Sequence, residues 1–80
     1  MDKRTFIRMI AEITEHNTHE LSMDMILDDI EGWNSLAVVT FIATCDLDLG
    51  ISIEVGNIPI AKTLGDLYKL VVDSGNNNLR

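Results

Sequence analysis

The sequence predicts an all-α fold, a small bundle of three main helices with a short irregular segment before the last one. The chain has 80 residues, of which 46% are hydrophobic, and this suits one folded domain. Apolar residues recur every three or four positions in three stretches, which is the spacing of one helix face. The run ISIEV alternates like a strand, but a lone short strand has no partner here, so we expect no sheet.

The first helix is predicted by four apolar residues that share one face, namely Phe6, Ile7, Ile10 and Ile13. We expect it to run from about residue 3 to about residue 16. Asp2 stands directly before it and can accept hydrogen bonds from the first backbone N–H groups.

A long connection follows, and Leu21, Ile26 and Ile30 are the residues expected to hold it against the core. Methionines in this region are expected to fill gaps or anchor the loop rather than to form a binding stripe.

Two histidines and several acids in this connection raise the question of a metal site. His16 and His19 lie near a helix end, but a zinc site would need a third ligand in a fixed frame, so we favour a solvated turn. The acidic run Asp28, Asp29 and Glu31 lacks the ligand spacing and central glycine of a calcium loop. We therefore expect no metal.

The second helix is predicted from Ser35 to about Leu49, and Asn34 is placed to cap it. Its core-facing stripe comprises Val38, Phe41, Ile42, Cys45 and Leu49. Gly50 follows, and glycine adopts the left-handed conformation that ends many helices.

The segment after Gly50 is expected to be an extended linker, with Ile51 and Ile53 packed inward. The stretch GNIPIA then predicts a single helical turn with Asn57 as its cap and Pro59 in its first turn.

The last helix is predicted to begin at Thr63, with Asp66 completing an approximate capping box. Its buried face comprises Leu64, Leu67, Tyr68 and Val71. Residues 74–80 lack apolar periodicity, so we expect one domain over residues 1–73 and a flexible tail over residues 74–80.

The charge of the chain bears on its partners and its location. Thirteen acids against six lysines and arginines give a formal charge of −7, which repels nucleic acids and anionic lipid surfaces. Basic proteins are therefore the expected partners. We expect the protein itself to be a monomer. The single Cys45 cannot form an internal disulfide, and the N-terminal residues lack the apolar run of a signal peptide, so we expect a cytoplasmic protein.

Ser35 is the residue that most needs an explanation, because Asn34 can cap the helix in its place. Its hydroxyl would then point outward beside free backbone amides and the positive end of the helix dipole, which favours an attached phosphate. Catalysis by Ser35 would require a general base and an oxyanion hole, and the sequence contains no Gly-x-Ser-x-Gly motif.

The order of these features resembles the acyl carrier proteins, of the freestanding type that includes peptidyl and aminoacyl carriers. The matching parts are WNSL at a helix start, VVTFI within that helix, Gly50 followed by ISI, and the late KTLGDLYKLV. The resemblance implies a non-enzymatic carrier with 4′-phosphopantetheine on Ser35, whose terminal thiol holds acyl or aminoacyl groups as thioesters. It also implies two kinds of partner, a phosphopantetheinyl transferase and the enzymes that load and transfer the cargo.

The resemblance also suggests which residues recognise partners and cargo. The residues expected to contact the transferase and partner enzymes are Asn34, Leu36, Val39, Thr40, Ala43, Asp46 and Leu47. Those expected to line an acyl pocket are Val38, Phe41 and Ile42. Where the family has Asp before the serine, this chain has Asn34, which caps a helix equally well but lacks the charge.

The outward face of the second helix leaves two interpretations open. Its apolar residues either form one docking surface for a dedicated partner in a specialised pathway or merely continue a hydrophobic helix. The alternative to a modified carrier is an unmodified protein–protein interaction module of the same fold.

Overall fold

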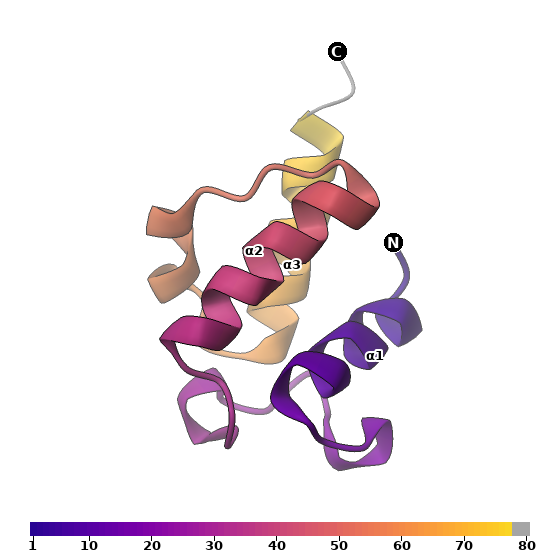
Figure 1. The fold of residues 1–80 in the computed structure, drawn as a ribbon, viewed down its shortest axis with the longest axis vertical. Helices are drawn as coiled ribbons and strands as arrows, with labels where there is room; N and C mark the ends of the chain where they lie inside the picture. Colours follow the sequence, from indigo (N-terminus) through magenta and orange to yellow (C-terminus); the bar gives the residue numbers. More distant parts are fainter. Residues whose placement is uncertain (78–80) are drawn as a thin grey trace.

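The computed structural model describes residues 1–77 and confirms the all-α architecture (Figure 1). Its elements in chain order are α1 (Lys3–Thr14), the 3-10 helices η1 (Thr18–Glu20) and η2 (Leu27–Asp29), α2 (Ser35–Leu49), the 3-10 helix η3 (Val55–Ile60) and α3 (Leu64–Asn77). Within residues 1–77 there is no β-strand, and extended backbone pairs only at an isolated bridge between Ile26 and Thr63.

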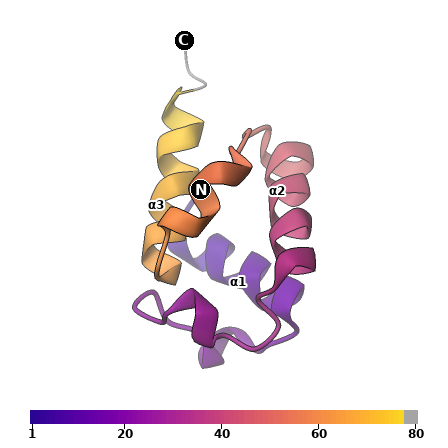
Figure 2. The ribbon, with the colours of Figure 1, turned by 90° about the vertical axis from the view of Figure 1, so that its left-hand side faces the viewer.

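Helices α2 and α3 run in the same direction, so their first turns lie at the same end of the molecule (Figure 2). α1 crosses behind them, and η3 lies in front, between α2 and α3. The long connection between α1 and α2 covers the end at which α2 and α3 begin (Figures 1 and 2). The connection therefore closes the end of the bundle at which both helices begin.

The core is filled by side chains from all three helices, with an aromatic cluster at its centre. Phe6 meets Phe41 and Tyr68 edge-on, with ring centres 6.4 and 5.3 Å apart. Leu67 and Val71 of α3 are fully buried beside them. Of the faces expected for α1 and α3, Phe6, Ile10, Leu64, Leu67 and Val71 are buried, and Ile7, Ile13 and Tyr68 are half-buried. Edge-to-face aromatic pairs of this kind fix the relative positions of helices.

α1 is shorter than the sequence indicates. Asp2 caps it as expected, since its Oδ1 accepts the N–H of Thr5 at 2.8 Å. The helix ends at Thr14 rather than near residue 16, because Glu15 adopts the left-handed conformation with a φ of 61°. The backbone N–H of His16 then bonds to the carbonyl of Ala11 at 2.9 Å, which closes the last turn.

The connection is anchored partly by residues other than those expected. Ile30 is buried and Leu21 half-buried, as predicted, but Ile26 is 51% exposed, and Leu27 is buried in its place. The N–H of Leu27 bonds to the carbonyl of Lys62 at 2.8 Å, so this stretch is extended. Side chains alternate in extended backbone, which turns Ile26 outward and Leu27 inward.

α2 buries Ala37, Phe41 and Cys45, with Val38 and Ile42 half-buried at the edges of the stripe. The prediction for Leu49 was wrong, because this residue is 37% exposed. It lies one turn beyond Cys45, where the helix ends at Gly50, whose φ of 65° confirms the expected stop.

Between α2 and α3 the chain is extended as expected, with Ile53 buried and Ile51 half-buried. Asn57 does not cap the following helix, which begins after Glu54, three residues earlier than a cap at Asn57 would place it. The backbone N–H of Asn57 donates to the carbonyl of Glu54 at 3.0 Å, so Asn57 lies inside η3.

The start of α3 contains the capping box that the sequence predicts. The N–H of Asp66 donates to Oγ1 of Thr63 at 3.1 Å, and Oδ2 of Asp66 accepts the N–H of Thr63 at 3.2 Å. The helix extends to Asn77, so it includes residues 74–77 of the predicted tail. The last part of the predicted tail, residues 78–80, lies outside the described residues.

Candidate functional site at the start of α2

The turn that leads into α2 is fixed on two sides. Gly32 has a φ of 94°, and a Cβ there would lie 2.8 Å from the backbone oxygen of Thr14. Trp33 donates its backbone N–H to the carbonyl of Ile30 at 3.1 Å, and its ring meets Phe41 edge-on with centres 5.8 Å apart. The chain therefore enters α2 in one defined direction.

Asn34 caps α2 and leaves Ser35 available. Oδ1 of Asn34 accepts the N–H of Ala37 at 3.0 Å, and its backbone oxygen accepts the N–H of Val38 at 2.9 Å. Ser35 occupies the first helical position with its side chain exposed, and its hydroxyl has no hydrogen-bond partner within residues 1–77. The N–H groups of Ser35 and Leu36 belong to the open first turn, where the helix dipole favours an anion.

A pocket of about 360 Å³ opens beside Ser35. Its walls come from α2, η2, η3 and the segment before α3, and include Val38, Leu27, Ile58 and Pro59. Asp28 and Lys62 contribute one carboxylate and one ammonium to the lining. A group attached to Ser35 therefore has apolar walls and one charge of each sign next to it.

The three residues expected to line an acyl pocket are not brought together. Val38 lines the pocket beside Ser35. Phe41 is fully buried in the aromatic cluster, so it lies in the core instead. Ile42 lines a separate hollow of about 500 Å³ on the outside of α2, together with Ser52 and Ile53.

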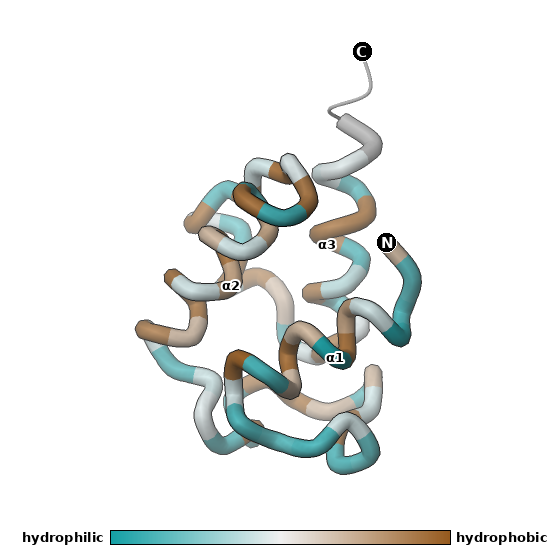
Figure 3. Tube along the Cα trace, turned by 45° about the vertical axis from the view of Figure 1, so that its right-hand side comes forward, coloured by the Kyte–Doolittle hydropathy of each residue, from teal (hydrophilic) through white to brown (hydrophobic). Residues whose placement is uncertain are grey.

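The outward side of α2 carries an apolar stripe, which we call the α2 outer face and define as Leu36, Val39, Ala43 and Leu47. Leu36, Val39 and Leu47 are 75%, 62% and 81% exposed, and Ala43 is exposed as well. Their spacing of three or four residues places them on one side of the helix over about 16 Å. Figure 3 shows the apolar character of α2, which is mostly white and brown, whereas the connection after α1 begins with hydrophilic residues in teal.

The polar residues expected at this surface differ in what their side chains do. Asp46 is exposed and shares the hollow outside α2 with Val39 and Ala43. Thr40 is also exposed, but its hydroxyl donates to the carbonyl of Leu36 at 3.0 Å and is used within the helix. Asp46 is therefore the polar group of the pair that is free to meet a partner.

His16 has a structural role. Its Nε2 lies 2.7 Å from the backbone oxygen of Glu31, and its Nδ1 lies 3.4 Å from Oε1 of Glu20. These contacts tie the end of α1 to the segment before α2. Within residues 1–77 no group of three or more His, Cys, Asp or Glu side chains is arranged to hold a metal ion.

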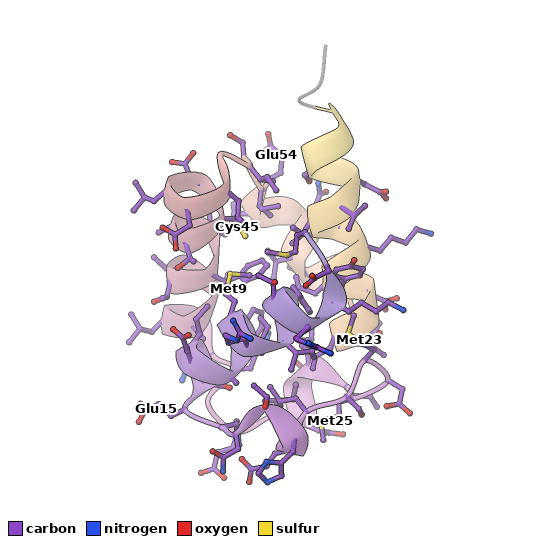
Figure 4. The ribbon with its side chains drawn as sticks, turned by 90° about the vertical axis from the view of Figure 1, so that its right-hand side faces the viewer. Met9, Glu15, Met23, Met25, Cys45 and Glu54 are labelled. Carbon is purple, nitrogen blue, oxygen red and sulfur yellow. The ribbon has the colours of Figure 1, made fainter. Side chains whose placement is uncertain are left out.

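Cys45 is a buried apolar side chain, as the sequence indicates. It is fully buried, and burial raises the pKa of its thiol to about 11. Figure 4 shows the sulfur atoms of Cys45 and Met9 in the interior between α1 and α2. Burial and the raised pKa keep the thiol protonated near neutral pH, which disfavours redox or nucleophilic chemistry at this residue.

Several residues of the pocket beside Ser35 were not predicted as site residues, among them Asp28, Ile58, Pro59 and Lys62. Pro59 and Lys62 come from segments far from Ser35 in the chain, and no local pattern connects them with it. A sequence signal existed only for Asp28, which stands in the acidic run before α2.

Comparison with known proteins gives no match to a family model, to a curated protein or to a solved structure. Among the helices of residues 1–77, none has the length and apolar character needed to cross a bilayer.

Proposed function

We propose that this chain is a carrier protein of the acyl carrier type, with 4′-phosphopantetheine attached to Ser35. In this proposal it holds an acyl or aminoacyl group as a thioester and passes it between cytoplasmic enzymes of a specialised biosynthetic pathway. The observation that carries the proposal is the exposed hydroxyl of Ser35 at the first position of α2, where Asn34 supplies the cap. If a serine caps a helix, its side-chain oxygen instead accepts a hydrogen bond from a backbone N–H of the first turn.

The surroundings of Ser35 support a phosphodiester at this position. The N–H groups of Ser35 and Leu36 and the helix dipole favour an anion beside the first turn. Lys62, which lines the adjacent pocket, adds a positive charge on the same side, where Asp28 adds a negative one. The apolar walls of that pocket, including Val38 and Ile58, suit the carbon chain of the arm or its cargo.

The attachment is a phosphoryl transfer from coenzyme A. The Ser35 oxygen bonds to the phosphorus that bears the pantetheine, and the bond from this phosphorus to the bridging oxygen of the pyrophosphate breaks. Adenosine 3′,5′-bisphosphate leaves, and the hydroxyl proton passes to a base on the transferase. Within residues 1–77 no side chain is hydrogen-bonded to Ser35 as a base would be, so we propose that the chain is not itself an enzyme.

Mass spectrometry tests the proposal. The full chain is incubated with coenzyme A and a broad-specificity phosphopantetheinyl transferase, and one phosphopantetheine mass should be added. Ser35→Ala should abolish the addition, whereas Ser52→Ala, which changes another exposed serine, should leave it unchanged. An unchanged mass for the folded wild type with several transferases would favour the unmodified interaction module.

The α2 outer face is proposed as the surface on which the transferase and the loading enzymes dock. Its exposed leucines and valine would be buried by a partner that covers Ser35 at the same time. Burial of apolar surface is little affected by salt, whereas charge-driven docking weakens as salt increases. We therefore expect modest salt dependence for modification of Ser35.

Substitutions on this face test the docking proposal through the rate of Ser35 modification. Leu47→Glu and Ala43→Glu should lower kcat/KM at least about tenfold while the circular dichroism spectrum is unchanged, since an unpaired charge would enter a desolvated contact. Asp46→Asn and Asp48→Asn, the matched charge controls, should have smaller effects. A steep loss of rate with salt and a harmless Leu47→Glu would instead show docking by charge.

The second candidate is an unmodified helical interaction module of the same fold. The α2 outer face favours it too, because an exposed apolar stripe can serve docking without any chemistry at Ser35. The mass measurement above separates the two.

A further inference from the structure

Another hollow lies away from the α2 outer face and is lined by residues of the connection between α1 and α2. It has a volume of about 620 Å³, and we call it the connection groove. Its apolar lining comprises Leu21, Met25, Ile26 and Ile30. Met25 and Ile26 are 37% and 51% exposed, so apolar side chains remain open to solvent here. Figure 4 shows Met25 at the end of the molecule opposite Glu54.

The backbone around these exposed side chains is held in place. The carbonyl of Met25 accepts the N–H of Leu64 at 3.0 Å, and its N–H donates to the carbonyl of Ser22 at 3.1 Å. One residue beyond Ile26, the N–H of Leu27 bonds to the carbonyl of Lys62. The groove is therefore formed before any partner arrives, which lowers the entropic cost of binding.

The rim of the connection groove is acidic. Its charged lining residues are Glu20, Asp24, Asp29 and Glu31, and the lining residues in the described part of the chain include no lysine or arginine. Glu20 and Asp24 are held locally, by the N–H of Asn17 at 2.7 Å and by the hydroxyl of Ser22 at 2.6 Å. Asp29 and Glu31 form no ion pair within residues 1–77.

We propose that the connection groove is a docking site for a basic amphipathic segment of a partner protein. Such a segment would place apolar side chains on Met25 and Ile26 and surround them with lysines or arginines that face the acidic rim. The negative rim disfavours nucleic acid phosphates and anionic lipids as occupants.

A second copy of this chain fits the same groove less well. Its basic residues on α1, Lys3, Arg4 and Arg8, surround Ile7, but Ile7 is half-buried against its own core. Apart from Met1, which is 39% exposed near Lys3, the large exposed apolar residues outside the groove lie on α2 and η3, near acids such as Asp46 and Glu54. A separate basic segment therefore suits the groove better than a second copy, whose basic residues are accompanied by little exposed apolar surface.

The groove also adjoins the site at Ser35, because Ile26 lines both the connection groove and the pocket beside Ser35. A segment seated in the groove would lie next to that pocket, on a surface separate from the α2 outer face. The inference does not depend on modification of Ser35, since it rests on the groove and its charges.

The test uses a synthetic helical peptide with leucines on one face and lysines on the other, titrated into the full chain and followed by amide chemical shifts. Shifts should concentrate in residues 20–31, and affinity should fall steeply with salt. Met25→Ser should weaken binding about tenfold, whereas Leu49→Ser, which has the same exposure on α2, should change it less than about twofold.

A charge comparison completes the test. Asp29→Asn with Glu31→Gln should weaken binding about tenfold, and Asp46→Asn with Asp48→Asn, which removes the same charge from α2, should have little effect. Equal losses for the two double variants, or shifts centred on α2, would overturn the proposal by showing general charge attraction or another site. Modification of Ser35 in the Met25→Ser variant, measured by mass, keeps this result separate from the carrier proposal.

Discussion

Helices α2 and α3 begin at the same end of the molecule, yet their first turns are closed differently (Figure 2). At α3, Thr63 and Asp66 exchange hydrogen bonds, and Oδ2 of Asp66 also accepts the N–H of Lys62 at 3.1 Å. At α2, Oδ1 of Asn34 accepts one hydrogen bond from the backbone N–H of Ala37. The side chain of Ala37 has no group that could bond back to Asn34. The start of α3 is sealed by its own side chains, while the start of α2 keeps Ser35 and the adjacent N–H groups open.

This difference separates a helix start that serves only stability from one that is free for chemistry. The open start must be stabilised by residues outside the helix, and here Gly32 and the ring of Trp33 do so through Thr14 and Phe41. Four predictions test or sharpen the contrast.

The largest effect is expected from the glycines at the two helix starts. Gly32→Ala should destabilise the fold by about 1 to 3 kcal/mol, because the residue would be strained at positive φ and its Cβ would collide with the oxygen of Thr14. At Gly65, inside α3, a Cβ would lie 3.1 Å from the oxygen of Met23, and the gain in helix propensity of roughly 0.5 to 1 kcal/mol opposes this contact. Urea unfolding of both variants measures the difference, and equal losses would remove the special role of Gly32.

The caps themselves should come next. Asn34→Ala should cost about 0.5 to 2 kcal/mol, since the N–H of Ala37 loses its acceptor. Thr63→Ala should lower the free energy of unfolding by a similar amount, as measured by thermal unfolding. It should leave the rate of Ser35 modification unchanged, whereas Asn34→Ala should lower that rate. Equal modification rates for the two alanine variants would mean that order at the start of α2 does not limit the reaction.

Acid should affect the two starts unequally. The N–H groups of Lys62 and Thr63 lower the pKa of Asp66 below 3.8, so its capping contribution is complete above that pH and is lost as the pH falls through the lowered value. Asn34 does not titrate. The difference in Tm between wild type and Asp66→Asn should therefore shrink between about pH 5 and about pH 2. A constant difference would show that the charge of Asp66 does not stabilise α3.

The smallest effect on stability is expected from Asn34→Asp, because both residues cap helices about equally well. The Tm should hardly change. Under the proposed carrier function, modification of Ser35 should become faster if the transferase recognises a carboxylate before the serine. Equal rates for Asn and Asp would show that the charge at this position is not read.

The starts of the three main helices and their caps could be predicted from the sequence because they depend on local spacing, whereas the cap predicted at Asn57 was wrong. Asp2, Asn34 and the pair Thr63 and Asp66 each act as caps where the pattern places them. The inward face of α2 was likewise predictable, apart from Leu49 at its end. Ser35 could also be identified from local spacing, because its exposed position follows from the cap at Asn34 directly before it.

Some of the errors arose where distant segments decide the conformation. Ile26 was predicted to point inward in place of Leu27. The bridge to Thr63, far along the chain, decides which of the two side chains is buried. The residues expected to line an acyl pocket, Val38, Phe41 and Ile42, were chosen along one helix, and of these Val38 lines the pocket beside Ser35. Lys62 and Pro59 reach it only through the tertiary arrangement.

The backbone bonds that join the connection to the start of α3 have a consequence for the order of folding. The N–H groups of Leu27, Leu64 and Gly65 bond to the carbonyls of Lys62, Met25 and Met23. Each pair closes a loop that contains the whole of α2, and such closure is entropically costly, so these contacts are expected to form late. Since the pocket beside Ser35 includes Lys62, it is completed only when these bonds have formed. The amide protons of Leu27, Leu64 and Gly65 should therefore exchange with solvent as one group, through a single cooperative opening.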